Sequence, residues 1–328
     1  MATASTRLPV LLTAFKRADT TRKVFEALQA VKPPRLYFAC DGWRNEQERQ
    51  KCMEVRELVS LVDWPCELKT RFSPVNRGSK WGMSESISWF FEHEEEGVIL
   101  EDDIIPANSF FPFCEELLER YRTDERVWAI IGNNLMTEWV PRNQDSYWFS
   151  SHGYGAYWGW ASWRRSWAQF DVTMAKWPTV RDSRMLTGYF LNSAEREEGN
   201  KIFESCWNEN IPTAWDYQFD FAKVIARGAN IIPSVNLCRN IGFVGEGTHT
   251  VHKNDVRNKE ELHEAAFPLV HPSSHLIDPE RDALYFERYI RPSFVRRLKN
   301  MVKELLPEKV DKAITSWLDA LQRKLGLR

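Results

Sequence analysis

The sequence predicts an α/β protein with a mostly parallel sheet flanked by helices, and three observations lead to this prediction. Short apolar runs alternate with segments of helical spacing through the first half of the chain. The runs are continuous, as in residues 9–15 (PVLLTAF), which is typical of strands covered on both faces. Acidic residues directly follow two of the runs, at Asp41 and at residues 101–103. Such alternation favours right-handed βαβ units, whose sheets bind ligands beyond the carboxyl ends of the strands.

The first half of the chain divides cleanly into strands and helices. Strands are expected at residues 9–15, 36–40, 66–72, 97–100 and 127–132, and helices at 20–30, 46–61, 83–93 and 110–121. Thr20 or Thr21 is expected to cap the first helix, and the pair Pro33-Pro34 ends it. The pair Asp41-Gly42 is a common turn and ends the second strand.

The second half is less regular. Residues 153–167 (GYGAYWGWASWRRSW) begin as a glycine loop and are expected to continue as a helix, because Trp160, Trp163 and Trp167 follow helical spacing. A helix is expected at residues 215–227, a strand at 231–237 and a glycine-rich loop at 242–250. Most of the tryptophans are expected to pack in the core, although a tryptophan can also stack on a sugar or a nucleobase.

Composition excludes several classes of protein. The net charge is -2, and no basic motif points to a nucleic-acid partner. The six cysteines lie far apart without a CxxC pair, so neither zinc nor a disulfide framework is expected, and Cys40, Cys114 and Cys238 are expected in the core. No apolar run is long enough for a secretory signal or a membrane span. These features together predict a cytoplasmic protein.

We expect a domain at residues 1–255, with a nucleotide-binding half (1–132) and an acceptor and catalytic half (133–255). Residues 256–328 would form an extension with basic amphipathic helices. Residues 291–328 carry ten Lys and Arg against four Asp and Glu, and an apolar stripe runs through Val310, Ile314, Trp317, Leu321 and Leu325. The stripe could dock on the body of the protein, form a subunit contact, or lie on an anionic membrane at the inner face of the cell.

The strongest chemical signal is the triplet Glu101-Asp102-Asp103 after an apolar strand. Three adjacent carboxylates repel one another, and a hard divalent cation such as Mn²⁺ or Mg²⁺ would offset their charge with oxygen ligands. Such a metal could bridge to a diphosphate and stabilise a leaving nucleotide. The alternative is a solvated acidic turn, and both interpretations remain open at this point.

Two further residues at strand ends have a functional and a structural interpretation. Asp41 could accept the imide N–H of a uracil, which requires an unpaired acceptor, or it could only form a turn with Gly42. Arg17 could meet a phosphate or a pyrimidine, or it could be a surface arginine before a helix.

Together these residues resemble the GT-A glycosyltransferases, and within them the N-acetylglucosaminyltransferase I group with its EDD form of the DXD motif. The resemblance covers residues 8–255. Its motifs are a strand with Arg17, LYFACDG with Asp41, Asn76-Arg77-Gly78, VILEDDI, the Phe110-Phe111 helix, Val127-Trp128, Gly153-Tyr154-Gly155 with Trp158, Trp215-Asp216 and Gly247-Thr248-His249.

The resemblance implies a role for each matching position. Arg17 and Asp41 would hold the nucleobase, Glu101 and Asp102 the hydroxyls of the sugar and ribose, and Asp103 the metal. Asp216 matches the acidic residue that acts as the base in inverting members, and residues 242–254 would close over the donor.

Four more residues join the predicted donor site, two of them at a departure from the family. Trp158 belongs to it through its motif. His249 could bind the diphosphate or the metal, or it could be an exposed loop residue. Arg77 and Lys80 stand where the resembled group has a histidine nearby, so the identity of the donor is not implied.

The sequence therefore predicts a metal-dependent glycosyltransferase that moves a sugar, GlcNAc or a similar one, from a nucleotide-sugar donor, expected to be UDP-linked, to a glycan or a lipid-linked acceptor, with inversion. One alternative is a sugar-nucleotide nucleotidyltransferase, which normally has a glycine-rich phosphate loop after the first strand, where this chain has TAFKRAD without glycine. A second alternative is a non-catalytic module that binds carbohydrate or metal.

Overall fold

The structure is a computed structural model, and it describes residues 5–137, 139, 143–151, 157–183, 185–186, 188–211, 215–242 and 261–291. The chain divides into two units, residues 1–282 and 283–328. The first unit therefore extends beyond the boundary at residue 255 that the sequence suggests. Among the described residues of the second unit, Phe286–Ile290 form a π-helical turn, closed by an ion pair between Arg291 and Glu287.

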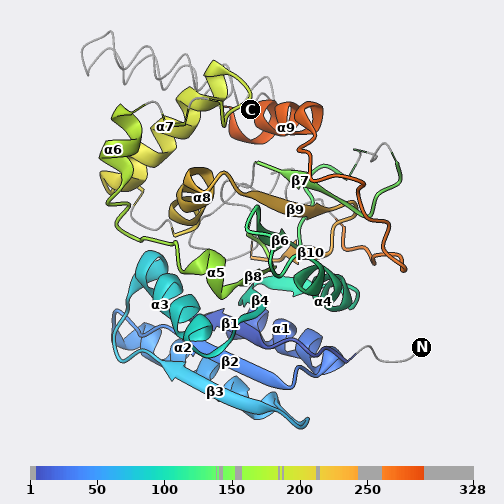
Figure 1. Cartoon of the computed structure of the whole chain (residues 1–328). Coiled ribbons are helices and arrows are strands. Elements are labelled where there is room, and N and C mark those ends of the chain that lie inside the picture. The colour runs from blue at the N-terminus through green and yellow to red at the C-terminus, as the bar shows by residue number, and fades with distance from the viewer. Residues whose placement is uncertain are drawn as a thin grey trace, which may run out of the picture. The chain divides into compact units, whose positions relative to one another are not determined.

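The first unit is an α/β structure built on a mixed, mostly parallel sheet of eight strands (Figure 1). Along the sheet the order is β3-β2-β1-β4-β8-β6-β9-β7. Its strands are β1 (Val10–Ala14), β2 (Arg35–Cys40), β3 (Glu67–Phe72), β4 (Glu96–Glu101), β6 (Val127–Ile131), β7 (Tyr147–Ser150), β8 (Trp160–Trp163) and β9 (Ala229–Pro233). Strands β3, β2, β1 and β4 are parallel neighbours, as are β6 and β9, whereas β8 and β7 run antiparallel to their neighbours. The prediction of an α/β fold with a mostly parallel sheet is confirmed.

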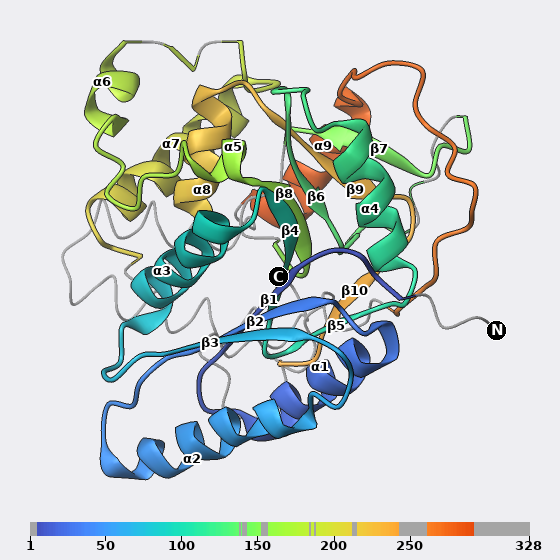
Figure 2. The ribbon, with the colours of Figure 1, turned by 60° about the horizontal axis from the view of Figure 1, so that its bottom comes forward.

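Helices cover both faces of the sheet. They are α1 (Ala18–Val31), α2 (Glu46–Glu57, continued by a 3₁₀ turn at Leu58–Leu61), α3 (Gly78–His93), α4 (Phe110–Arg120), α5 (Arg164–Trp167), α6 (Trp177–Asp182), α7 (Ser193–Trp207), α8 (Asp216–Ile225) and α9 (Pro279–Tyr285). Figure 2 shows α1 and α2 on one face of strands β1 to β3 and α3 on the other. None of the helices within the described residues is long and apolar enough to cross a membrane.

The strands separate two hydrophobic cores because successive side chains of a strand point to opposite faces. In β1, Val10 and Leu12 lie in the core under α1, α2 and α4, whereas Leu11 lies in the core under α3, α5 and α8. A third cluster joins α6, α7 and α8 around Trp177 and Phe203. Cys40, Cys114 and Cys238 are buried free thiols, as expected.

Residues 160–167 correct the expected helix. Trp160 to Trp163 form strand β8, and only Arg164–Trp167 is helical. Trp160 enters the core under α3 and Trp163 the opposite core, as alternation in a strand requires. All three tryptophans are buried as expected, but the helical spacing was a coincidence.

Two helix starts also differ from expectation. Helix α1 begins at Ala18, and the hydroxyls of Thr20 and Thr21 donate to the carbonyl of Arg17 instead of capping the helix. Helix α3 begins at Gly78, five residues before the expected start at 83. Gly78 and Gly82 interrupt the apolar spacing there, and the start of the helix is set by a distant carboxylate described below.

A second, two-stranded sheet brings a late segment back to the acidic triplet. Strand β5 (Ile104–Pro106) follows the triplet and pairs antiparallel with β10 (Cys238–Asn240). The backbone N–H of Ile241 then donates to the carbonyl of Asp103 at 2.8 Å.

Candidate active site

A cavity of about 460 Å³ lies at the carboxyl ends of β1 to β4, the edge where the fold predicts a ligand. Its walls are residues 13–17 after β1, residues 39–41 and 44 after β2, the end of β3, the first half of α3, and Glu101 and Asp102 at the end of β4. The volume is within the range of small-molecule sites.

The cavity brings together five of the predicted site residues, Arg17, Asp41, Arg77, Glu101 and Asp102. Its described lining does not include Lys80, Asp103, Trp158 or Asp216. His249 and residues 243–254 of the predicted closing loop lie outside the described residues.

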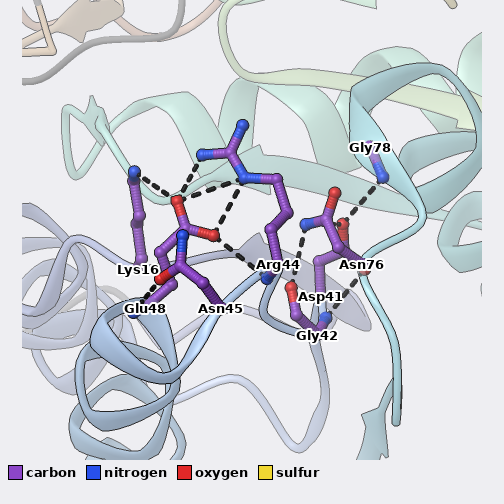
Figure 3. Close-up of polar contacts among 8 residues, drawn as sticks. All are labelled: Lys16, Asp41, Gly42, Arg44, Asn45, Glu48, Asn76 and Gly78. Carbon is purple, nitrogen blue, oxygen red and sulfur yellow. Dashed lines mark hydrogen bonds and ion pairs between the residues drawn. The ribbon is translucent and has the colours of Figure 1, made fainter.

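Asp41 anchors the start of α3 to the end of β2. Its carboxylate accepts hydrogen bonds from the backbone N–H groups of Gly42 and Gly78 and from the side-chain amide of Asn76 (Figure 3). The backbone N–H of Arg77 also donates to it. Burial raises the pKa of Asp41, and the backbone N–H groups counter that effect. The carboxylate is therefore fully engaged, so the unpaired acceptor that recognition of uracil requires is not present in this structure.

We predict that Asp41→Ala destabilises the protein by about 1–3 kcal/mol, because three donors at the start of α3 and the backbone N–H of Gly42 lose their acceptor. Urea unfolding would measure the loss, with Glu26→Ala, an exposed change on α1, as the control. A loss equal to that of the control would contradict the anchoring role.

Arg17 neutralises the acidic triplet from the end of β1. One guanidinium nitrogen, Nη2, pairs with Oδ1 of Asp102 and lies 2.8 Å from Oδ2 of Asp103. The backbone N–H of Phe15 also donates to Asp102. Burial on its own lowers the pKa of Arg17, but the two aspartates raise it above its usual value. Arg17 therefore stays charged and offsets one of the three carboxylates.

Two carboxyl groups near Arg17, those of Glu101 and Asp102, ionise less readily than usual. Burial, and then repulsion by Asp103, Asp102 and Asp216, raises the pKa of Glu101 well above its usual value. Burial raises the pKa of Asp102 to about 6, although Arg17 acts in the opposite direction. Triplet and arginine together leave an excess of negative charge at this end of the cavity.

We predict that Glu101→Gln stabilises the protein at pH 8, because burial and the neighbouring aspartates penalise the ionised Glu101 carboxylate and the amide carries no charge. The folded state holds the Glu101 proton more tightly than the unfolded state does. At pH values above the pKa of Glu101 in the unfolded chain, ionisation of this group therefore lowers the free energy of unfolding. That cost disappears as the pH falls and the group is protonated in both states. The gain should therefore be larger in thermal unfolding at pH 8 than at pH 4, and equal gains at the two pH values would contradict the prediction.

Gly242 packs directly against the pair of Arg17 and Asp103. A Cβ atom at this position would stand 2.0 Å from Oδ2 of Asp103 and 2.7 Å from Nη1 of Arg17. Only glycine fits there without displacing the pair. The first residues after β10 thus lie against the triplet, and the rest of the predicted closing loop, residues 243–254, lies outside the described residues.

The residues present fit a divalent cation that is shared with a ligand. Asp102 and Asp103 supply the carboxylate oxygens that Mn²⁺ or Mg²⁺ prefers, and such ions commonly take one or two carboxylates plus phosphate and water. Within the residues that the structure describes, no three His, Cys, Asp or Glu side chains form a metal-binding group. Both aspartates are paired with Arg17, so a metal here would have to share them with that guanidinium.

Asp216 lies at the start of α8, near Glu101. Burial, followed by repulsion from Asp220, raises the pKa of Asp216 to about 6, and backbone N–H groups including that of Tyr217 act in the opposite direction. Asp216 also contributes to the raised pKa of Glu101, so the two carboxyls belong to one electrostatic cluster.

Lys80 and Trp158 take other places. Lys80 is buried on α3, and its Nζ lies 3.3 Å from Oε1 of Glu209 in the turn after α7. Trp158 is partly buried against the core under α1 and α4. Neither position matches a direct contact with a ligand in the cavity.

Sequence reasoning missed three charged residues that line the cavity, Lys16, Arg44 and Arg71. Lys16 and Arg44 meet on Glu48, and Arg71 meets the predicted Arg77 on Glu85. The signal was available in part, since Lys16 adjoins Arg17 and follows a strand. The carboxylate partners come from separate helices, and sequence spacing does not show which cation they meet.

Comparisons with known proteins leave the family open. No protein-family model matches the chain, and no curated protein matches it. Among 53 matching chains of solved structures is HddC from Yersinia pseudotuberculosis, with 8% identity over 48% of this chain and 78% of that chain and a TM-score of 0.28. Neither the identity nor the score is high enough to support an argument about function.

Proposed function

We propose that the protein is a glycosyltransferase that uses a nucleotide-sugar donor. The observation that carries this proposal is the cavity at the strand ends, whose lining combines the cations Lys16, Arg44 and Arg71 with Glu101 and the Arg17-paired Asp102. A nucleoside diphosphate sugar needs both kinds of group, cations for its phosphates and carboxylates for its hydroxyls and metal.

Each residue then has a role that its place supports. Arg17 would balance the charge of Asp102 and Asp103 and contact the phosphates, and Glu101 would accept from hydroxyl groups. Asp103 would hold Mn²⁺ or Mg²⁺, which when bound supplies positive charge to the departing phosphate. Asp216 would take the proton of the attacking acceptor, a glycan or a lipid-linked sugar.

Donor hydrolysis tests this proposal directly. Purified protein would be incubated with a panel of UDP, GDP and dTDP sugars, with and without Mn²⁺, and release of the nucleoside diphosphate would be measured. Thermal shift with the same panel would identify the donor. Absence of both hydrolysis and stabilisation for every donor would overturn the proposal and would favour a non-catalytic module.

A nucleotidyltransferase is the second candidate, because Lys16 and Arg17, two cations directly after β1, both line the cavity. Such an enzyme would release pyrophosphate from a nucleoside triphosphate and a sugar 1-phosphate. Pyrophosphate release without any hydrolysis of nucleotide sugars would select this candidate.

We also propose that the basic C-terminal residues 291–328 contact an anionic membrane. Most of this segment lies outside the described residues, so the proposal depends on its charge and apolar stripe. The full-length chain should sediment with phosphatidylglycerol vesicles at low salt, and a chain ending at Arg291 should not. Equal sedimentation of the two chains would contradict the proposal.

A further inference from the structure

Two cations from different loops meet at the mouth of the cavity. Lys16 follows β1 and Arg44 follows β2, and both line the cavity. Figure 3 shows the two side chains converging on Glu48 in the first turn of α2. The distance from Nζ of Lys16 to Oε1 of Glu48 is 2.8 Å, and Nε of Arg44 lies 2.9 Å from Oε2.

Glu48 is held in place independently of any ligand. Asn45 caps α2 by accepting from the backbone N–H of Glu48, and the Glu48 carboxylate accepts from the backbone N–H of Arg44. Only 7% of Glu48 is exposed, and Arg44, then Lys16, keeps the pKa of its carboxyl well below the usual range. The carboxylate is therefore ionised at any physiological pH and fixes both cations.

Positive charge remains after this pairing. Two cations share one carboxylate, and the N-terminus of α2 adds a partial positive charge. None of the hydrogen bonds among the described residues uses Nη1 of Arg44, and 58% of its side chain is exposed. Both cations lie over the ring of Phe15, at 5.5 Å for Lys16 and 5.6 Å for Arg44.

A second cluster of two arginines and one carboxylate also lines the cavity, and its carboxylate is less well fixed than Glu48. Arg71 and Arg77 also share one carboxylate, that of Glu85. The side chain of its anchor, Glu85, is 32% exposed, against 9% for that of Glu48, so solvent screens the Glu85 carboxylate more. A site with a buried anchor binds an anion better because its geometry is set beforehand.

We propose that Phe15, Lys16 and Arg44 form a phosphate-binding shelf, positioned by Glu48, that takes the phosphate groups of the ligand. The inference rests on the proposed function, because it assumes that the cavity holds a phosphate ester. Lys16 and Arg44 donate to phosphate oxygens, and Glu48 acts only by positioning them. The shelf is separate from the triplet, so it binds phosphate without a metal.

The test is calorimetry in EDTA, which removes any contribution of metal. The probes are inorganic pyrophosphate, UDP, uridine and glucose 1-phosphate. The variants are Lys16→Gln and Arg44→Gln, each of which leaves Glu48 with one cation. Arg49→Gln, the loss of an exposed cation on α2 that pairs with Glu46, is the charge-matched control.

Each shelf variant should weaken pyrophosphate binding by about tenfold, the typical effect of one charge-assisted hydrogen bond, and the control should not. The same loss with UDP and not with glucose 1-phosphate identifies a nucleotide as the source of the phosphate; the reverse identifies a sugar phosphate. Uridine binding should not change in any variant. Near-UV circular dichroism would establish that the variants are folded.

Two results would overturn the shelf. One is that pyrophosphate does not bind the wild-type protein at millimolar concentration, and the other is equal binding by folded variants and control. Failure of the proposed function has a different signature. In that case no nucleotide sugar is hydrolysed, yet phosphate binding still depends on Lys16 and Arg44.

Discussion

Asp216→Asn is expected to lower the rate of sugar transfer by roughly 10²–10⁴-fold, the usual contribution of a general base. Asn has nearly the same shape and is as good as Asp near a helix start, so the fold and the donor affinity should hardly change. The comparison requires kcat with a saturating acceptor, together with the dissociation constant of the donor. Asp182→Asn, an exposed change on α6, is the control.

The pH profile gives a second readout of Asp216. Burial raises the pKa of Asp216 to about 6, so the group is mostly ionised at pH 7 and able to accept a proton. The rate should therefore fall as the pH drops below about 6. Near wild-type transfer by Asp216→Asn, or a product with retained anomeric configuration, would show that Asp216 is not the base.

Asp103→Ala is expected to abolish the Mn²⁺-dependent part of nucleotide binding, a loss of at least about tenfold in affinity. The fold should remain intact, because Asp102 still pairs with Arg17 and one carboxylate of a repelling cluster is gone. Titration with UDP in the presence and absence of Mn²⁺ would measure the effect. Asp63→Ala, an exposed change, is the control.

If Asp103→Ala binds UDP with the same dependence on Mn²⁺ as the wild type, Asp103 is not the metal ligand. The prediction is separate from the phosphate shelf, whose binding is measured in EDTA. A protein that loses the effect of Mn²⁺ but keeps pyrophosphate binding would support both assignments.

The sequence was most informative where strand ends carry charge. Arg17, Asp41, Glu101 and Asp102 were chosen because they follow apolar runs, and parallel strands bring such ends to one edge. Their meeting in one cavity follows from the topology alone. What topology cannot show is whether a carboxylate is free. The donors that engage Asp41 lie at residues 76–78, and only the folded chain brings them close.

Residues 160–163 show why the element type was mistaken. Residues i and i+3 lie on one side of a helix but on opposite faces of a strand. Here both faces of the sheet are covered, so Trp160 and Trp163 are buried on either side. An apolar spacing distinguishes a helix from a strand only where one side meets water.

Lys80 was placed in the donor site because it stands where the resembled group has a histidine nearby. Ser79, Gly82 and Met83 lie on the face of helix α3 that lines the cavity. Lys80 lies on a different face of the helix, and its side chain pairs with Glu209. Because helix α3 begins at Gly78, Lys80 lies in its first turn, and this sets the direction of the Lys80 side chain. The expected start at residue 83 left Lys80 outside the helix, so its direction could not be predicted.

The tryptophan next to Asp216 gives the protein an optical signal of its own. Trp215 stacks on Trp160 with ring centroids 5.8 Å apart and planes inclined by 24°, and both rings are buried. Two indoles this close couple their electronic transitions and produce a paired positive and negative band in the circular dichroism spectrum. Trp215 opens α8 immediately before Asp216, so a ligand that shifts this helix end would change the coupling. Substrate binding near Asp216 can then be followed in the native protein without a label. Trp160→Phe should reduce the signal to the coupling that remains between Trp215 and Trp167, whose ring centroids lie 6.4 Å apart.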